Sequence, residues 1–343
     1  MPLTAKVEID RVRKELGIPE YVDPSNFLME RGLVTIWAAQ DPTRLREFGF
    51  SEALEKAGDT GIPVVLFGGG AVKLLSKTAN EHTSPLCREI GDIDLLTSKK
   101  NAQKLCYLLL ALGELLGTRY YHFMTLGDQR FNSLQMGQRY RVRTIDRVLD
   151  DATCRSGTLD IFVDGINLRH RVDVRDALEN AKNCVYTIGP TNLILSKCQY
   201  ILDSPRSNYD ELVESGLAYR VLHYPHYRND KFLIGIEEKD IKDICAILLD
   251  HEVGEQEVDV RTDVLRRVLG KDKKFALTFK LNLESLARNE KMLEEMRLPK
   301  SSIETVIQRT NEILEAVPKN DKKWNNPWWN EDVETPRIFG KAL

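Results

Sequence analysis

The sequence predicts an α/β fold, in which a small sheet with its helices is followed by a mainly helical C-terminal domain. Two apolar runs of strand length, 64–67 and 92–96, are separated by a glycine triplet and a helix-compatible segment, 71–76. Helical patterns then dominate residues 237–253 and the runs that lead to residue 316. We therefore expect the sheet in the first part of the chain and the helical domain in the last.

Composition restricts the classes of protein that fit. At 343 residues with a formal net charge of −3, the chain is long enough for two domains and has no overall attraction to nucleic acid, so RNA binding would need a local basic patch. The six cysteines contain no Cys-x-x-Cys pair, which argues against zinc and disulfides. No apolar run approaches the roughly 20 residues that span a bilayer. We expect a cytoplasmic protein with no membrane partner.

Pattern and composition divide the chain into four expected parts. Residues 1–41 form a lead-in with a charged helix and a segment that has no decisive period. Residues 42–203 contain the sheet and its helices, and residues 204–316 form the helical C-terminal domain. Residues 317–343 form a tail with proline and three tryptophans.

The spacing of apolar residues places further elements around the two strands. We expect helices over 42–57 and 101–116, and strands over 139–143, 158–163 and 186–188. The first of these helices should end at Gly58, just before the strand at 64–67.

Asp92 and Asp94 flank Ile93 in the second predicted strand. Period-two geometry places both carboxylates on one face, with Ile93 on the other. Carboxylates on an apolar strand are costly to bury unless a cation or a proton offsets their charge. We interpret the pair as a divalent-metal site, and the alternative is an aspartate pair that caps a turn without a metal.

The glycines at 68–70 come directly after the first strand. Without a Cβ, such a turn lets backbone N–H groups approach phosphates, so we interpret it as a phosphate cradle. Two competing glycine motifs do not fit. Lys73 stands where a dinucleotide-binding G-x-G-x-x-G needs its third glycine, and no Gly-Lys-Ser/Thr follows for a P-loop.

The order of these features resembles the nucleotidyltransferase superfamily with its minimal polymerase-β-like fold. The matching residues are Gly68 and Gly69 for the paired small residues, Arg88 ahead of the acidic strand, and then Asp92 and Asp94. The resemblance implies a nucleotidyltransferase fold, that is, a small mixed sheet flanked by helices, and makes 42–203 the catalytic domain.

The superfamily has a third carboxylate on a later strand, and here Asp160 supplies it in an apolar setting. The resemblance implies that Asp92, Asp94 and Asp160 are catalytic and hold two Mg²⁺ ions, which prefer oxygen ligands. In such a site one ion lowers the pKa of the attacking hydroxyl, and the other stabilises the leaving pyrophosphate. Gly68 and Gly69 would then contact the phosphates of the nucleotide.

Arginines near this site leave two alternatives open. Arg88 could donate two hydrogen bonds from its forked guanidinium to a phosphate, which we favour slightly, or pair with a carboxylate and lock its loop in place. Arg139, Arg141 and Arg143 alternate along a predicted strand, so they should share one face. That face is either a phosphate- or RNA-contacting edge or a solvated strand face.

Two later features resemble the AbiEii-type nucleotidyltransferases, the toxins of type IV toxin–antitoxin systems, and their chromosomal relatives. Lys197 lies in a predicted helix after the sheet, and Asp240 and Asp243 fit the group's R/K-Asp-x-x-Asp-hydrophobic pattern. The resemblance implies that Lys197 contacts the triphosphate and that the two aspartates face the same site, where Asp243 pairs with Lys197 or holds its helix. The alternatives are a surface lysine and helix N-terminal charges.

The expected function is the Mg²⁺-dependent transfer of a nucleoside monophosphate from an NTP to a hydroxyl, with release of pyrophosphate. The resemblance favours an RNA acceptor such as tRNA, a protein acceptor is the other option, and an antitoxin is an implied partner. The net negative charge opposes RNA. Two alternatives remain: an adenylyltransferase of the antibiotic-modifying kind, and a non-catalytic protein that keeps the fold to bind a nucleotide or a partner.

Overall fold

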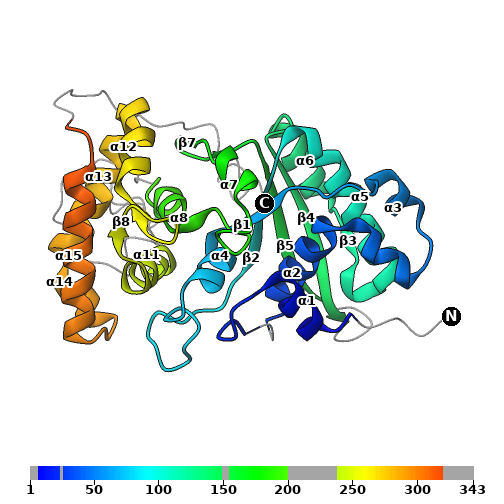
Figure 1. The fold of residues 1–343 in the computed structure, drawn as a ribbon, viewed down its shortest axis with the longest axis horizontal. Helices are drawn as coiled ribbons and strands as arrows, with labels where there is room; N and C mark the ends of the chain where they lie inside the picture. Colours follow the sequence, from blue (N-terminus) through cyan, green and yellow to red (C-terminus); the bar gives the residue numbers. More distant parts are fainter. Residues whose placement is uncertain (1–6, 24–25, 149–153, 200–237, 320–343) are drawn as a thin grey trace. The chain divides into compact units, whose positions relative to one another are not determined.

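The computed structural model describes residues 7–23, 26–148, 154–199 and 238–319, which form two compact units (Figure 1). Unit 1 comprises Met1–Leu75, Glu89–Ile166 and Asp173–Ile188, and unit 2 comprises Ser76–Arg88, Asn167–Val172 and Gly189–Leu343. The division differs from the expected boundaries. Of the expected lead-in, the described residues belong with the sheet, and the boundary after the sheet lies at 188 rather than at 203.

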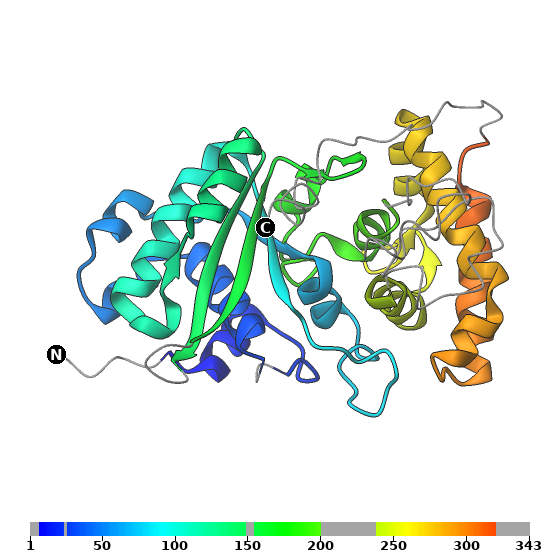
Figure 2. The ribbon, with the colours of Figure 1, turned by 180° about the vertical axis from the view of Figure 1, so that it is seen from behind.

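Unit 1 contains a five-stranded mixed sheet of order β1-β2-β5-β4-β3, which agrees with the predicted α/β class. Its strands are β1 (Val64–Phe67), β2 (Asp92–Thr97), β3 (His122–Phe123), β4 (Arg139–Val148) and β5 (Cys154–Val163). β2 pairs in parallel with β5, and all the other neighbours are antiparallel. The long antiparallel pair of β4 and β5 is visible in Figure 2. β1, β2, β4 and β5 correspond to predicted strands.

Helices surround this sheet and connect its strands. They are α1 (Ile9–Leu16), α2 (Phe27–Gln40), η1 (Pro42–Phe48), α3 (Glu52–Ala57), α4 (Gly68–Leu75), α5 (Lys99–Leu116), η2 (Thr118–Tyr120), α6 (Leu126–Leu134) and α7 (Arg175–Glu179). α5 confirms the predicted helix over 101–116, and α4 begins at the glycine triplet rather than after it.

The segment at 27–40, expected to be part of a lead-in without a clear period, is the buried helix α2. α2 packs against β1, β2 and α5. A Cβ on Gly157 of β5 would lie 2.2 Å from Leu28 Cδ2, so glycine is needed for α2 to approach the sheet. A helix that is buried on nearly every side has no polar stripe, and therefore its sequence shows no amphipathic period.

Two other predicted elements differ in the structure. The helix expected over 42–57 is split into η1 and α3 because Gly49 between them adopts a φ of +133°, and Asp41 and Ser51 each cap a new helix start. The strand expected at 186–188 is a single parallel bridge, in which Thr187 pairs with Leu66 of β1.

Unit 2 is mainly helical, as predicted for the C-terminal part. The helices in its described residues are α8 (Gly189–Lys197), α11 (Glu238–Asp250), α12 (Thr262–Lys271), α13 (Lys273–Arg288), α14 (Glu290–Glu295) and α15 (Lys300–Ala316). α15 packs against α11, α12, α13 and α14, and α11 packs against α8. The buried rings of Phe275 and Phe279 meet edge to face at 6.1 Å within this core.

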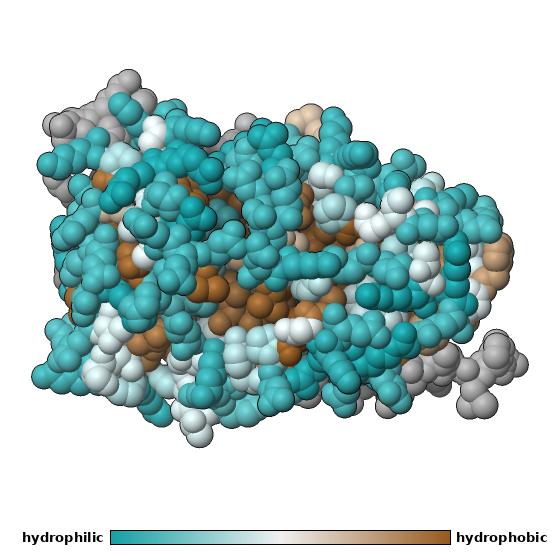
Figure 3. All heavy atoms as spheres, viewed as in Figure 1, coloured by the Kyte–Doolittle hydropathy of each residue, from teal (hydrophilic) through white to brown (hydrophobic). Residues whose placement is uncertain are grey.

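Short strands complete the fold: β6 (Ile166–Asn167) with β7 (Arg171–Val172), and β8 (Val253–Gly254) with β9 (Val260–Arg261). The expected polar stretch at 204–236 and the tail from residue 320 lie outside the described residues. Hydrophilic side chains cover most of the face shown in Figure 3. No helix in the described part of the chain is long and apolar enough to cross a membrane.

Candidate functional site

Strand register in unit 1 places charged side chains in a row across three strands. Asp94 of β2 is the partner of Asp160 of β5, and Asp160 is the partner of Arg141 of β4. In the next row, Asp92 is the partner of Thr158 on β5. Residues in register share a face of the sheet, so the carboxylates and the guanidinium project to the same side. Ile93 projects to the other side, as predicted.

Asp94 lies against the first turn of α4. A Cβ on Gly68 would be 2.2 Å from Asp94 Oδ2, and Gly68 has a φ of +65°, so only glycine suits this position. The positive end of a helix favours an anion, and the first N–H groups of α4 have no partner within the helix. Gly68 therefore admits the carboxylate of Asp94, a role that the phosphate-cradle interpretation did not include. Gly69 follows as the second residue of α4.

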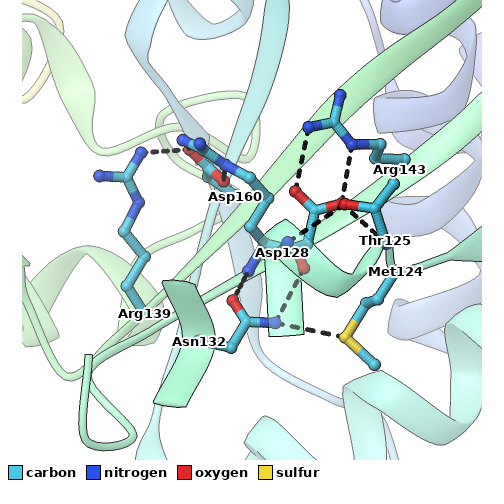
Figure 4. Close-up of polar contacts among 8 residues, drawn as sticks. Met124, Thr125, Asp128, Asn132, Arg139, Arg143 and Asp160 are labelled. Carbon is cyan, nitrogen blue, oxygen red and sulfur yellow. Dashed lines mark hydrogen bonds and ion pairs between the residues drawn. The ribbon is translucent and has the colours of Figure 1, made fainter. Parts of the chain in front are cut away.

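Asp160 is almost fully buried, with 1% of its side chain exposed, and it pairs with two arginines. Arg141 donates from Nε to Oδ1 and from Nη2 to Oδ2, both at 2.8 Å, and Arg139 donates from Nη2 to Oδ2 (Figure 4). Burial alone raises the pKa of Asp160, but the hydrogen bonds and charges of Arg141 and Arg139 outweigh it and lower the pKa below its usual range. Asp160 is therefore ionised at neutral pH.

Aromatic rings hold the two arginines in place. The guanidinium of Arg139 lies 4.4 Å from the ring centre of Phe162, and that of Arg141 lies 4.4 Å from the ring centre of Phe131. Phe162 is the register partner of Arg139, and Phe131 comes from α6. Such contacts attract the cation and restrict its rotamers.

Arg143, the third of these alternating arginines of β4, forms an ion pair with a different carboxylate, that of Asp128. Arg143 donates from Nε and Nη2 to Asp128 at 2.7 and 3.0 Å (Figure 4). Thr125 Oγ1 donates to the same carboxylate at 2.6 Å within the capping box of α6. The arginines of β4 thus share one face, but they lie against aspartates of their own unit and do not form the solvated strand face that was one alternative.

Asn132 of α6 extends the edge of β4 beside this site. Its Oδ1 accepts from Arg141 N at 2.6 Å, and its Nδ2 donates to Arg141 O at 3.0 Å (Figure 4). These are the bonds that a neighbouring strand would make where the two-residue strand β3 has ended. Sequence reasoning missed both Asp128 and Asn132. Their i, i+4 spacing on one helical face, just before the alternating arginines, is the signal that could have indicated them.

The aspartates of unit 1 fit a magnesium ion only in part. Asp92 is exposed and Asp94 is half-buried, and both offer oxygen donors. Both oxygens of Asp160 already accept from arginines. Across the residues described, no group of three His, Cys, Asp or Glu side chains is arranged to hold a metal ion. One or two carboxylates together with substrate phosphates can hold Mg²⁺, and Asp92 and Asp94 satisfy that condition.

The other predicted site residues form a charge cluster in unit 2. Arg88 donates from Nε and Nη2 to Asp243 at 2.8 and 2.6 Å. Lys197 of α8 lies 2.9 Å from Asp240 and 2.7 Å from Asp243, both of α11. Two alternatives were predicted for Arg88, and in the structure it pairs with a carboxylate, that of Asp243. Lys197 is not a surface lysine, since only 11% of its side chain is exposed.

This cluster is electrically balanced. Burial alone lowers the pKa of Lys197, but the charges of Asp240 and Asp243 outweigh it and raise the pKa. Burial alone raises the pKa of Asp243, and Lys197 and Arg88 reverse that shift and lower it. The ion pairs of these four side chains tie α8 and α11 to the loop that ends at Arg88.

The predicted site residues therefore fall into two sets, one within each unit. Comparison with protein-family models, with curated proteins and with solved structures found no significant match to this chain.

Proposed function

We propose that unit 1 contains the active centre of a Mg²⁺-dependent nucleotidyltransferase, which moves a nucleoside monophosphate from an NTP to a hydroxyl and releases pyrophosphate. The observation that supports this most directly is the carboxylate of Asp94 against Gly68 at the start of α4. It puts an oxygen ligand for a cation beside backbone N–H groups that suit phosphates.

Each part of this centre has a separate task. Asp92 and Asp94 would hold Mg²⁺, which when bound activates the acceptor hydroxyl and offsets the charge of the leaving pyrophosphate. The first turn of α4 would orient the phosphates. The acceptor oxygen then bonds to the α-phosphorus as the bond to the pyrophosphate oxygen breaks, and the hydroxyl proton passes to solvent. The acceptor is an RNA such as tRNA or a protein, and a small molecule remains the alternative.

A second candidate function follows from Asp160. Its oxygens are occupied by Arg139 and Arg141, so a protein that binds the nucleotide without transferring it would also suit this arrangement. Such a protein needs the cation and the phosphate contacts but no third metal ligand.

Label transfer separates the two functions. The full chain is incubated with each of the four α-³²P NTPs and Mg²⁺, and total RNA and a protein lysate are offered separately. The active-centre variant combines Asp92→Asn with Asp94→Asn. The matched control is Asp59→Asn, an exposed aspartate of unit 1 that pairs with Arg46 at its surface.

We expect label on RNA or protein with the wild type and the control, and none with the active-centre variant. NTP binding without label on RNA, protein or small-molecule extracts would favour the binding function instead. Absence of NTP binding would rule out both.

A further inference from the structure

The middle of the sheet in unit 1 places three carboxylates beside two guanidinium groups. Asp94 and Asp160 are register partners on β2 and β5, and Asp92 lies two residues before Asp94 on the same face. Arg141 is the register partner of Asp160 on β4, and Arg139 lies two residues before Arg141. The guanidinium groups therefore offset part of the negative charge of these aspartates.

Arg141 is a firmly held cation among these carboxylates. Both oxygens of Asp160 accept from it at 2.8 Å, and the ring of Phe131 lies 4.4 Å from its guanidinium. The hydrogen bonds of Asp160 raise the pKa of Arg141 above its usual value, burial opposes them, and the charges of Asp128 and Asp92 add to the rise. Asp92 thus acts on Arg141 although the two side chains come from different strands.

The contact with Arg141 keeps a metal ion away from Asp160. Only 1% of the Asp160 side chain is exposed, and each of its oxygens already accepts from a guanidinium. A divalent ion at the same oxygens would lie beside that positive charge and be repelled by it. Asp92 is exposed and Asp94 is half-buried, so these two carboxylates stay open to a cation.

We propose that Arg141 is a built-in cation that takes the place of a second metal ion. It engages Asp160 and leaves Asp92 and Asp94 to hold a single Mg²⁺. A guanidinium is always charged and is tethered to the chain, so its charge stays at the site at any Mg²⁺ concentration. Arg141 is then a positioning residue that acts on the metal through Asp160. The inference rests on the proposed function in one respect, which is that the cation at Asp92 and Asp94 serves the nucleotide.

Metal binding without nucleotide tests the inference. The full chain is titrated with Mn²⁺, which takes the same oxygen ligands as Mg²⁺ and is followed by electron paramagnetic resonance. Binding that Asp94→Asn weakens defines the site. The test variant is Arg141→Gln. Arg143→Gln is the matched control, because it changes the net charge equally on the same strand but releases Asp128 instead of Asp160. A double variant, Arg141→Gln with Asp160→Asn, restores the net charge of the wild type and lacks the released carboxylate.

We expect Arg141→Gln to bind Mn²⁺ roughly 10-fold more tightly than the wild type, because Asp160 becomes available as a further oxygen ligand. The control should change less than about 2-fold, and the double variant should return to the affinity of the wild type. A test variant that binds no more tightly than the wild type, a control that gains as much, or a gain that persists without Asp160 would overturn the inference.

The test variant retains a cation beside the buried carboxylate, since Arg139 still donates to Asp160. Circular dichroism and thermal melting check that every variant folds. If Arg141→Gln does not fold, Arg141→Lys replaces it, because a lysine keeps the charge but cannot engage both oxygens of Asp160 in a fork. We then expect a gain in Mn²⁺ affinity of about 3-fold, and no gain would overturn the inference.

This result is separate from that of the transferase assay. Mn²⁺ affinity that rises in Arg141→Gln through Asp160, without label transfer to any acceptor, would support the built-in cation and remove the transferase. Label transfer that depends on Asp92 and Asp94, with Mn²⁺ affinity indifferent to Arg141, would do the reverse. Absence of Mn²⁺ binding in the wild type and in Arg141→Gln would overturn the inference together with the Mg²⁺ dependence of the proposed reaction.

Discussion

In unit 2, Arg88 and Lys197 are balanced by Asp240 and Asp243, whereas in unit 1 Arg139 and Arg141 both bind the single carboxylate of Asp160. The first set is closed, since each charge has an opposite charge beside it. The second set differs, since one carboxylate accepts from two guanidinium groups and the buried Nε of Arg139 makes no hydrogen bond. A closed buried network can hold elements together, and removal of one of its charges leaves the opposite charge buried without compensation.

Breaking the closed network should have the largest effect. Lys197→Met leaves Asp240 buried beside Asp243 without its cation, and loss of one partner from a buried pair costs about 3–5 kcal/mol. We expect the free energy of unfolding in urea to fall by about that amount. The matched control is Lys280→Met, whose side chain is exposed and 3.7 Å from Glu284. A loss that is equally small in both variants would contradict the structural role of the network.

Replacing Asp160 tests whether it is a metal ligand or a support for the arginines. With Asp160→Asn, we expect unchanged affinity for Mn²⁺, used as a spectroscopic substitute for Mg²⁺, because Asp160 is engaged by Arg139 and Arg141. With Asp94→Asn, we expect affinity for Mn²⁺ to fall roughly 10-fold, since an amide oxygen replaces a carboxylate ligand. Titration followed by electron paramagnetic resonance measures both. Weaker Mn²⁺ binding in both variants would show that Asp160 is also a metal ligand, as the predicted three-carboxylate site requires.

A buried histidine in each unit makes stability depend on pH. Burial lowers the pKa of His122 in unit 1 and of His170 in unit 2 from 6.5 to about 4. The unfolded chain therefore takes up protons first as the pH falls, so stability is complete above about pH 6.5 and decreases toward pH 4.

At pH 5.5, which is one pH unit below the pKa of an unfolded histidine, we expect each buried histidine to lower the free energy of unfolding by on the order of 1 kcal/mol. His122→Gln and His170→Gln should each reduce the pH dependence of urea unfolding between pH 7 and 5. The control is His82→Gln, because the side chain of His82, in the same loop region as Arg88, is exposed. Unchanged pH slopes in both test variants would refute this origin.

The smallest effect should come from the edge of β4. Asn132→Ala removes the two hydrogen bonds to the backbone of Arg141, and we expect about 1 kcal/mol of destabilisation. Ser133→Ala, the exposed neighbour on α6, is the control. Native-state hydrogen exchange at the Arg141 amide should accelerate only in the Asn132 variant, and protection that survives there would show that another group caps this edge.

The sequence by itself determined the local elements. Apolar runs bounded by glycine and polar residues predict β1, β2 and β5, and period two places Asp92 and Asp94 on one face. Alternation likewise places the arginines of β4 on one face. These features depend on backbone geometry within a few residues, which is why the sequence reveals them.

Only the tertiary structure decided how the charges pair. Arg88 and Asp243 are 155 residues apart, and Arg141 and Asp160 meet because of the register between β4 and β5. The buried role of α2 was equally invisible, because a helix covered on nearly every side has no polar stripe. Which carboxylate meets which cation depends on strand order and helix packing, and no periodicity in the chain encodes either.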